Sequence, residues 1–218
     1  TPMNGIDYTV ANHLSKSAEL IKTLKSFETE DISKLMGLSS NLAFLNFERY
    51  QSWKRPIKPS ADARQAVFAF QGDVYQGLEA ATFKKGDLKF AQKHLRILSG
   101  LYGILKPLDL MAPYRLEMGT KLSTKKHDDL YGFWKDTLTA DINTQLAEQK
   151  DSTLINLASN EYFNALNKKD IAGDIVSPVF KDFKNGDYKI ISFFAKKARG
   201  MMARYIIDNK VINPDGLA

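Results

Sequence analysis

The stretch LRILSGLYGILKPLDLMAPYRLEMG, residues 95–119, decides the fold that we expect for this chain. An amphipathic helix that begins at Asp87 runs into this stretch and ends at Ser99–Gly100. A second glycine, Gly103, follows three residues later. Two glycines this close leave backbone N–H groups unshielded, and neighbouring N–H groups can hold a phosphate. The stretch therefore predicts either a plain turn after a helix or a hairpin that contacts an anion.

Basic residues gather around the same stretch. Six lysines and arginines lie between His94 and Lys126, against two acidic residues. Helix-hairpin-helix modules grip a nucleic-acid backbone with hairpin amides, although their glycines are usually spaced Gly-x-Gly and here the spacing is Gly-x-x-Gly. On the phosphate-binding hypothesis the contacts come from the hairpin and two nearby basic side chains, namely Ser99, Gly100, Leu101, Tyr102, Gly103, Lys106 and Arg115.

The composition is that of a globular protein, with 218 residues, 44% hydrophobic and 26% charged. The absence of cysteine excludes disulfide frameworks and thiolate chemistry, and it fits a cytoplasmic protein. The longest apolar run, residues 189–195, is too short to span a bilayer, so we expect no membrane partner. A net charge of +6 and an isoelectric point near 9.3 favour anionic partners. A lysine-rich solvated surface is the alternative explanation of that charge.

Short strands mixed with helices predict a single α+β domain over residues 1–218. Apolar spacing and capping residues predict helices over residues 10–25, 31–36, 87–98, 128–149, 160–166 and 194–210, and a further helix that begins at Ser39 or Ser40. Strands are predicted over residues 66–70, 114–118 and 154–158, and the Lys-Asn-Gly-Asp sequence at 184–187 predicts the turn of a β-hairpin.

The last helix contains the sequence FFAKKARGMMARYII, residues 193–207. On a helical wheel its basic side chains share one side, with Gly200 in their middle, and its apolar side chains lie opposite. Glycine costs about 1 kcal/mol in a helix, so we expect a ligand or another backbone to approach it closely. The basic side predicts phosphate binding, and a solvated cationic face is the alternative. The candidate residues are Lys196, Lys197, Arg199, Gly200 and Arg204.

Catalytic signals are few. The three histidines are scattered, and no zinc-protease, nucleotide-loop or nucleophile-elbow motif occurs. Two short clusters each follow a predicted strand, where sites are often built. They contain the candidate acid/base residues Asp73, Tyr75, Glu161 and Tyr162, and Ser159 is expected to cap the helix after the second strand. Capping and turn roles are the alternative for all of them. The sequence predicts no cofactor and no metal site, because it lacks cysteines and helix-borne Glu-x-x-His pairs.

Four segments together resemble the YaaA family of bacterial peroxide-stress-response proteins. They are FQGDVYQGLEAATF (70–83), FAQKHLRILSGLYGILKPLDLMAPYRLEMG (90–119), INLASNEYF (155–163) and ISFFAKKARGMMARYII (191–207). The resemblance runs along nearly the whole chain. It departs from the family at both ends: the Ser-Pro-Ala-Lys segment that usually follows a first strand is absent, and so is a segment beyond the final helix. We therefore expect a single domain that is incomplete at both ends.

The resemblance implies a bacterial, cytoplasmic protein that helps the cell survive hydrogen peroxide by limiting free iron and the DNA damage it causes. It also implies an unusual α+β fold with a helix-hairpin-helix-like element, a basic cleft and DNA binding, without a firmly established catalytic activity. The hairpin corresponds to residues 99–103, and the basic helix to Lys196, Lys197 and Arg199.

Two hypotheses follow from these observations. The leading one is a stress protein that binds the backbone of double-stranded DNA non-specifically and needs no catalysis. The alternative is an enzyme acting on a small phosphorylated or nucleotide-like ligand, held by Asp73, Tyr75, Glu161, Tyr162 and Lys196. Direct iron sequestration is a third idea, which the scattered histidines argue against.

Overall fold

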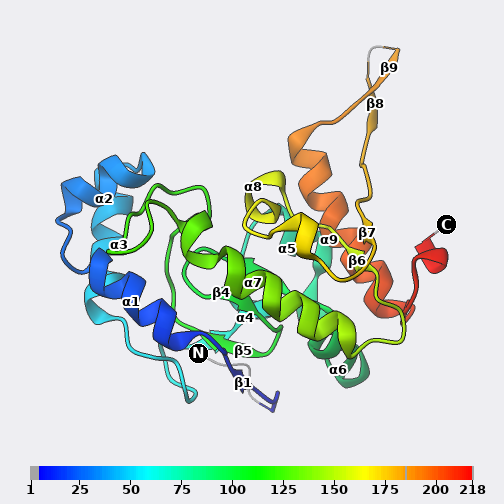
Figure 1. Cartoon of the computed structure of the whole chain (residues 1–218), viewed down its shortest axis with the longest axis horizontal. Coiled ribbons are helices and arrows are strands. Elements are labelled where there is room, and N and C mark those ends of the chain that lie inside the picture. The colour runs from blue at the N-terminus through cyan, green and yellow to red at the C-terminus, as the bar shows by residue number, and fades with distance from the viewer. Residues whose placement is uncertain (1–4, 185, 218) are drawn as a thin grey trace.

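The computed structural model describes residues 5–184 and 186–217, and it confirms a mixed α+β fold (Figure 1). The helices are α1 (Leu14–Leu24), α2 (Thr29–Met36), α3 (Ser40–Ser52), α4 (Ala66–Ala69), α5 (Asp73–Leu78), α6 (Lys85–His94), α7 (Leu130–Ala147), α8 (Asn160–Phe163) and α9 (Ser192–Asp208). The strands are β1 (Thr9–Val10), β2 (Arg64–Gln65), β3 (Ile97–Ser99), β4 (Gly103–Leu105), β5 (Asp109–Met111), β6 (Leu154–Ile155), β7 (Ile175–Val176), β8 (Asp182–Lys184) and β9 (Asp187–Lys189).

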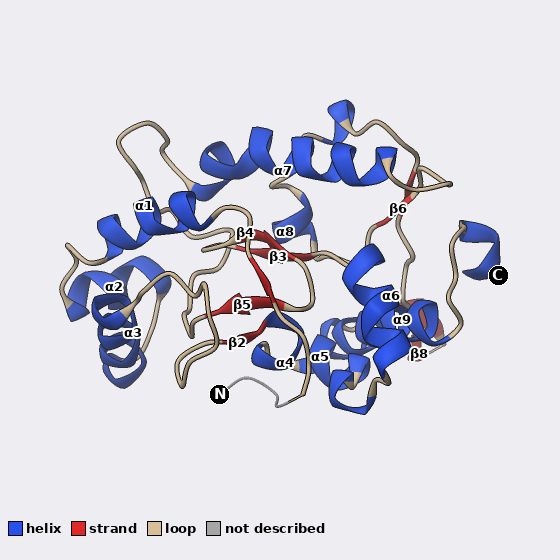
Figure 2. Cartoon of the chain, turned by 90° about the horizontal axis from the view of Figure 1, so that it is seen from below, coloured by secondary structure: helices blue, strands red, loops and turns tan. Residues whose placement is uncertain are grey.

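The strands form several small sheets. Strand β5 is the centre of one sheet, with β1 parallel on one side and β2 antiparallel on the other. The pairs β3–β4 and β8–β9 are antiparallel hairpins, whereas β6 and β7 pair in parallel. Figure 2 shows α7 running along one side of β3–β4, with β5 and β2 on the other side. The strands are thus short pieces inserted between helices.

The main core lies where α1, α3 and α7 meet the β3–β4 hairpin. Its largest fully buried side chains include Trp134, Tyr50 and Tyr102. A smaller core lies beneath α9, where Ala203 and Ile207 pack with apolar residues of α4, α5 and α6. The second core fixes the position of α9, and α9 supplies most of the candidate cationic residues.

Most predicted helices are confirmed, and the predicted hairpin at 184–187 is confirmed as β8–β9, although Asn185 lies outside the described residues. The predicted strand at 66–70 is wrong, because this short apolar run forms the helical turn α4. Periodicity cannot separate a buried strand from a buried helical turn of that length. The helix expected to reach residue 98 ends at His94, and Ile97–Ser99 pairs as β3.

The predicted strand at 114–118 is also wrong. Its side chains do alternate, since Leu116 and Met118 are buried while Arg115 and Glu117 are exposed. No strand among the described residues pairs with it, and the carbonyl of Arg115 accepts a hydrogen bond from the hydroxyl of Tyr50 instead. The alternating pattern therefore reflects a segment with one buried side and one exposed side, which does not form the hydrogen bonds of a sheet.

Helix α9 crosses α5 at a pair of glycines. A Cβ atom at Gly200 would lie 1.8 Å from the carbonyl oxygen of Val74, and one at Gly77 would lie 2.3 Å from that of Lys197. The close approach expected at Gly200 is therefore made by another backbone. The glycine side of α9 faces α5, whereas Met201 on the opposite, apolar side of the helix is 56% exposed. Only small residues permit two helices to lie this close together.

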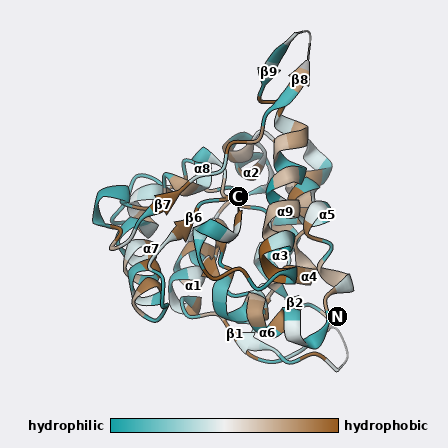
Figure 3. Ribbon diagram, turned by 90° about the vertical axis from the view of Figure 1, so that its right-hand side faces the viewer, coloured by the Kyte–Doolittle hydropathy of each residue, from teal (hydrophilic) through white to brown (hydrophobic). Residues whose placement is uncertain are grey.

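The β8–β9 hairpin projects from the rest of the molecule just before α9, and we refer to residues 182–184 and 186–189 as the arm (Figure 1). Figure 3 shows from another side that the arm stands clear of the other elements. Phe183 and Tyr188 contact each other edge to face, with ring centroids 5.2 Å apart, yet both are more than 60% exposed. The arm thus presents an aromatic pair to solvent.

Candidate functional site

A pocket of about 790 Å³ lies between α5, α8 and α9, and residues of α6, α7, β3, β6 and the C-terminal segment 211–217 also line it. Candidate residues from three separate segments line it: Asp73 and Tyr75 from α5, Glu161 and Tyr162 from α8, and Lys196, Arg199 and Gly200 from α9. The structure therefore brings both short polar clusters against the basic helix. These segments are far apart in the sequence and meet because α5 and α9 cross at their glycines.

Backbone geometry places the two polar clusters at helix beginnings. Asp73 is the first residue of α5 and follows Gly72, which adopts a φ of 115° that side-chain-bearing residues rarely adopt. Glu161 lies in the first turn of α8, directly after β6 and Ser159. Ser159 occupies the N-cap position in an extended conformation, but its side chain makes no capping hydrogen bond, contrary to our expectation.

The carboxylates differ in their partners. Glu161 accepts a hydrogen bond from the backbone N–H of Gly119 at 2.9 Å, which ties α8 to the end of the 95–119 stretch. Glu117 pairs with Arg115 at 2.8 Å. Within the described part of the chain, the Asp73 carboxylate has no hydrogen bond or ion pair. Asp73 is therefore the carboxylate most available to a ligand.

The two tyrosines of the pocket are hydrogen-bond donors at neutral pH. Burial raises the pKa of Tyr75 well above its usual value, and the neighbouring Tyr162 adds to the effect. Burial, with smaller contributions from Glu161 and Glu117, raises the pKa of Tyr162 to about 12. The ring of Tyr75 stacks on Phe70, with centroids 5.3 Å apart and planes inclined by 16°. Both phenols thus keep their protons near neutral pH.

The cations of α9 fall into two groups. Lys196 and Arg199 line the pocket, whereas Lys197 lies outside it. Both lysines are exposed. None of the three forms an ion pair with any residue that the structure describes. In the part of the chain that the structure describes, none of these three charges is therefore neutralised by an ion pair.

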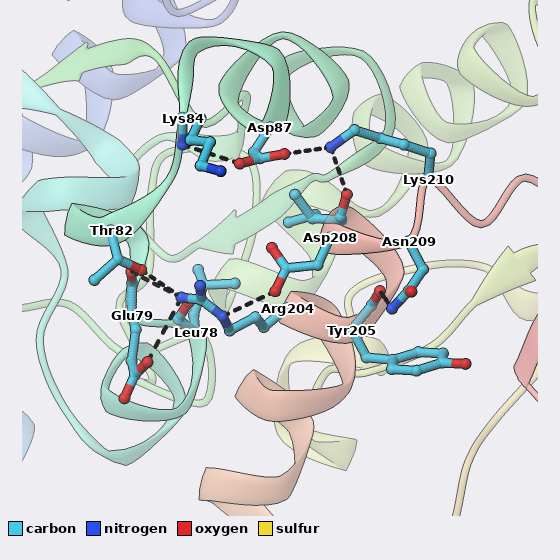
Figure 4. A network of polar contacts seen from close by, with 11 residues as sticks. Leu78, Glu79, Thr82, Lys84, Asp87, Arg204, Tyr205, Asp208, Asn209 and Lys210 are labelled. Carbon is cyan, nitrogen blue, oxygen red and sulfur yellow. Dashed lines mark hydrogen bonds and ion pairs between the residues drawn. The ribbon is translucent and has the colours of Figure 1, made fainter.

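Arg204 has a different role from the phosphate contact that we expected (Figure 4). Its guanidinium donates to the carbonyls of Leu78 and Glu79, each at 3.2 Å, and to the hydroxyl of Thr82 at 2.6 Å. It also bonds Asp208 at 3.1 Å and lies 5.3 Å from the centroid of the Phe83 ring. These contacts hold α9 against the end of α5, because most of the guanidinium donors point at the protein.

Residues 99–103 form the turn of a buried β-hairpin, which corrects the expected helix-hairpin-helix. Leu101 and Tyr102 have no exposed surface. The N–H of Tyr102 donates to the hydroxyl of Ser99, and the carbonyl of Gly100 accepts from the indole of Trp134, each at 2.9 Å. These polar groups are satisfied inside the fold, and the segment does not line the pocket. The turn at 99–103 and α9 therefore do not form one groove, although Ile97 and Leu98 of β3 do line the pocket.

Lys106 and Arg115 also lie outside the pocket. Lys106 lines a smaller cavity of about 160 Å³ that includes Asp109 and Glu148, and Arg115 is paired with Glu117. Sequence reasoning did not include Glu117 and the half-buried Arg96 among the pocket residues. Glu117 and Arg96 are single charged residues among apolar ones, and no sequence motif around them indicates that they line a pocket.

Neither a metal site nor a membrane span is found in residues 5–184 and 186–217. No group of three or more histidine, aspartate or glutamate side chains there is arranged to hold a metal ion. No helix in the same residues has both the length and the apolar character needed to cross a bilayer.

Comparison with known proteins identifies the family. Residues 2–218 match the family described as Peroxide stress protein YaaA. A UPF0246 protein of Teredinibacter turnerae is 51% identical over 224 residues, which cover 99% of this chain and 87% of that protein. UPF0246 proteins of Saccharophagus degradans and Shewanella woodyi are 54% and 53% identical, over 100% and 99% of this chain and 84% of each relative. This chain is therefore a member of the peroxide stress protein YaaA family.

Proposed function

We propose that this chain acts in the cytoplasm during peroxide stress by binding the backbone of double-stranded DNA with little sequence preference. The observation that carries this proposal is the pair of exposed lysines on α9, Lys196 and Lys197, which have no acidic partner among the described residues. Unpaired surface cations on a chain of net charge +6 attract a polyanion, and backbone contacts of this kind carry no sequence information.

The arm, which precedes α9, extends the proposed DNA-binding surface. Lys189 of the arm is exposed, as is Lys181 immediately before it. Phe193 and Phe194 begin α9 and are 55% and 51% exposed. Exposed apolar groups that lie among charged residues often mark an interaction site. The arm and the first turns of α9 are thus our candidate DNA surface.

Binding to the backbone also offers a route to less iron-dependent damage. DNA phosphates concentrate cations around the duplex, and a protein that neutralises phosphates releases them. Ferrous ions held at the backbone are among the cations that would be released. On this proposal the chain lowers damage by displacing iron from DNA, without holding the iron itself.

The test is duplex binding measured across a salt series with purified protein. Lys196→Ala combined with Lys197→Ala should weaken binding and reduce the slope of log K against log salt by about 2, since each phosphate contact contributes about 0.9. The matched control is Lys22→Ala with Lys25→Ala, which removes the same charge from exposed positions at the far end of the molecule, in and just after α1. Binding that ignores salt, or equal losses in both double variants, would refute the proposed surface.

Protection is tested separately with supercoiled plasmid, ferrous ion and hydrogen peroxide. The wild-type protein should reduce nicking at concentrations that cover the plasmid, and the α9 double variant should protect less at equal concentration. Equal protection by both proteins would show that the effect does not depend on this DNA contact.

A further inference from the structure

We propose that the pocket between α5, α8 and α9 is a second binding site, for a small phosphorylated molecule of nucleotide size. It shares Lys196 with the proposed DNA surface and is otherwise distinct from it, because Lys197 and the arm lie outside the pocket. Its volume of about 790 Å³ falls in the usual range for small-molecule sites, about 300–1,000 Å³.

One wall of this site is suited to a phosphate. Lys196 and Arg199 are three residues apart on α9, so their side chains leave the same side of the helix. Both line the pocket, and neither forms an ion pair in the described part of the chain. Tyr75 also lines the pocket, and its hydroxyl makes no hydrogen bond within the described residues. A protonated phenol and two cations are donors that a phosphate can accept from.

The remaining wall is suited to the uncharged part of such a molecule. Asp73, Glu117 and Glu161 offer carboxylate oxygens, which accept hydrogen bonds from ligand hydroxyl or amino groups. The Phe70 ring, which stacks on Tyr75, also lines the pocket and adds an apolar surface. A ligand with an anionic group at one end and a ring bearing hydroxyl or amino groups at the other would satisfy both walls. A nucleoside monophosphate has this chemistry.

The same three carboxylates argue against a DNA backbone in the pocket. A duplex presents a row of phosphates, and those beyond the first would approach Asp73, Glu117 or Glu161. Like charges at close range are unfavourable. A molecule with a single phosphorylated end avoids this repulsion, which is why we assign the pocket to a small ligand and the outer cations to DNA.

The experiment is calorimetric titration of the 218-residue chain with each of the four ribonucleoside monophosphates, and with inorganic phosphate as the probe for the anion end alone. We expect at least one nucleotide to bind about tenfold or more tightly than inorganic phosphate, because phosphate alone uses only one wall. Arg199→Gln should weaken nucleotide binding about tenfold or more. Tyr75→Phe keeps the stacked ring, removes only the hydroxyl, and should weaken it by about tenfold.

Lys196→Ala and Lys197→Ala as single variants separate the two sites. Lys196→Ala should weaken both nucleotide and duplex binding, whereas Lys197→Ala should weaken duplex binding and leave nucleotide affinity within twofold of wild type. The pocket proposal fails if no nucleotide binds at millimolar concentration, if inorganic phosphate binds as tightly as every nucleotide, or if Lys197→Ala reduces nucleotide affinity as much as Lys196→Ala does. None of these results tests the DNA proposal, which the salt series of duplex binding tests independently.

Discussion

Two β-hairpins in the described residues share strand length and a left-handed glycine but have opposite surroundings. Each pairs two strands of three residues, and each has a glycine in the left-handed region: Gly103, directly after the first turn, at φ 72°, and Gly186, in the second turn, at φ 79°. The β3–β4 hairpin is almost entirely buried, whereas Phe183 and Tyr188 of β8–β9 are more than 60% exposed. Turn chemistry thus makes a hairpin, and the side chains beside the turn decide whether it becomes core or a projecting arm.

The largest effect should come from adding one methyl group to the turn of each hairpin. Gly103→Ala places a Cβ 2.6 Å from the Trp134 ring on a left-handed backbone. We expect a loss of about 1–3 kcal/mol for the backbone and about 1–3 kcal/mol more for overpacking. Gly186→Ala meets no atom within 4 Å, so only the conformational cost applies. The measurement is the urea midpoint of each variant. Similar losses in both would show that β3–β4 is not a core element.

A second pair of variants compares one hydroxyl in each hairpin. The Tyr102 hydroxyl accepts hydrogen bonds from the Trp53 indole at 3.1 Å and from the N–H of Ala112 at 2.9 Å. Tyr102→Phe leaves both buried donors without this partner and should cost about 2–3 kcal/mol. Tyr188→Phe in the arm should change the free energy of unfolding by less than about 0.5 kcal/mol. Chemical denaturation measures both, and a negligible loss in Tyr102→Phe would contradict the buried network.

The smallest effect concerns the exposed ion pair between Asp87 and Lys210. Asp87 belongs to α6, which precedes the β3–β4 hairpin, and Lys210 follows α9, which comes after the β8–β9 hairpin. The hydrogen bond from Lys210, together with one from the backbone of Lys84, lowers the pKa of Asp87 (Figure 4). A lowered folded pKa contributes stability above the unfolded value of about 3.9, and this contribution is lost as pH falls through the folded pKa. Asp87→Asn should therefore be slightly less stable than wild type at pH 7, with the difference shrinking towards pH 3. A difference that persisted at pH 3 would exclude this ionisation as its cause.

The sequence predictions were accurate where an element depends on neighbouring residues and inaccurate where it depends on contacts with distant parts of the chain. The amphipathic pattern of 128–149 and the Asn-Gly turn at 184–187 are local signals, and both predicted their elements correctly. The pattern at 87–98 predicts one helix, although Ile97 and Leu98 at its end pair with β4 beyond the turn. Local propensity could not show that pairing, because it depends on burial of the hairpin against Trp134. The phosphate-binding turn predicted at 99–103 requires backbone N–H groups that a ligand can reach, but all five residues are buried.

The sequence by itself determined the mixed α+β class, the family, most helices and the kinds of residue from which a site could be built. Only the tertiary structure decided that Asp73, Glu161 and Lys196 line one pocket and that Gly100 does not. The physical reason is that the position of α9 depends on backbone contact between Gly200 and α5, which lies more than a hundred residues earlier. A helical wheel shows which residues share a side of α9. Packing against a distant helix determines which side is buried.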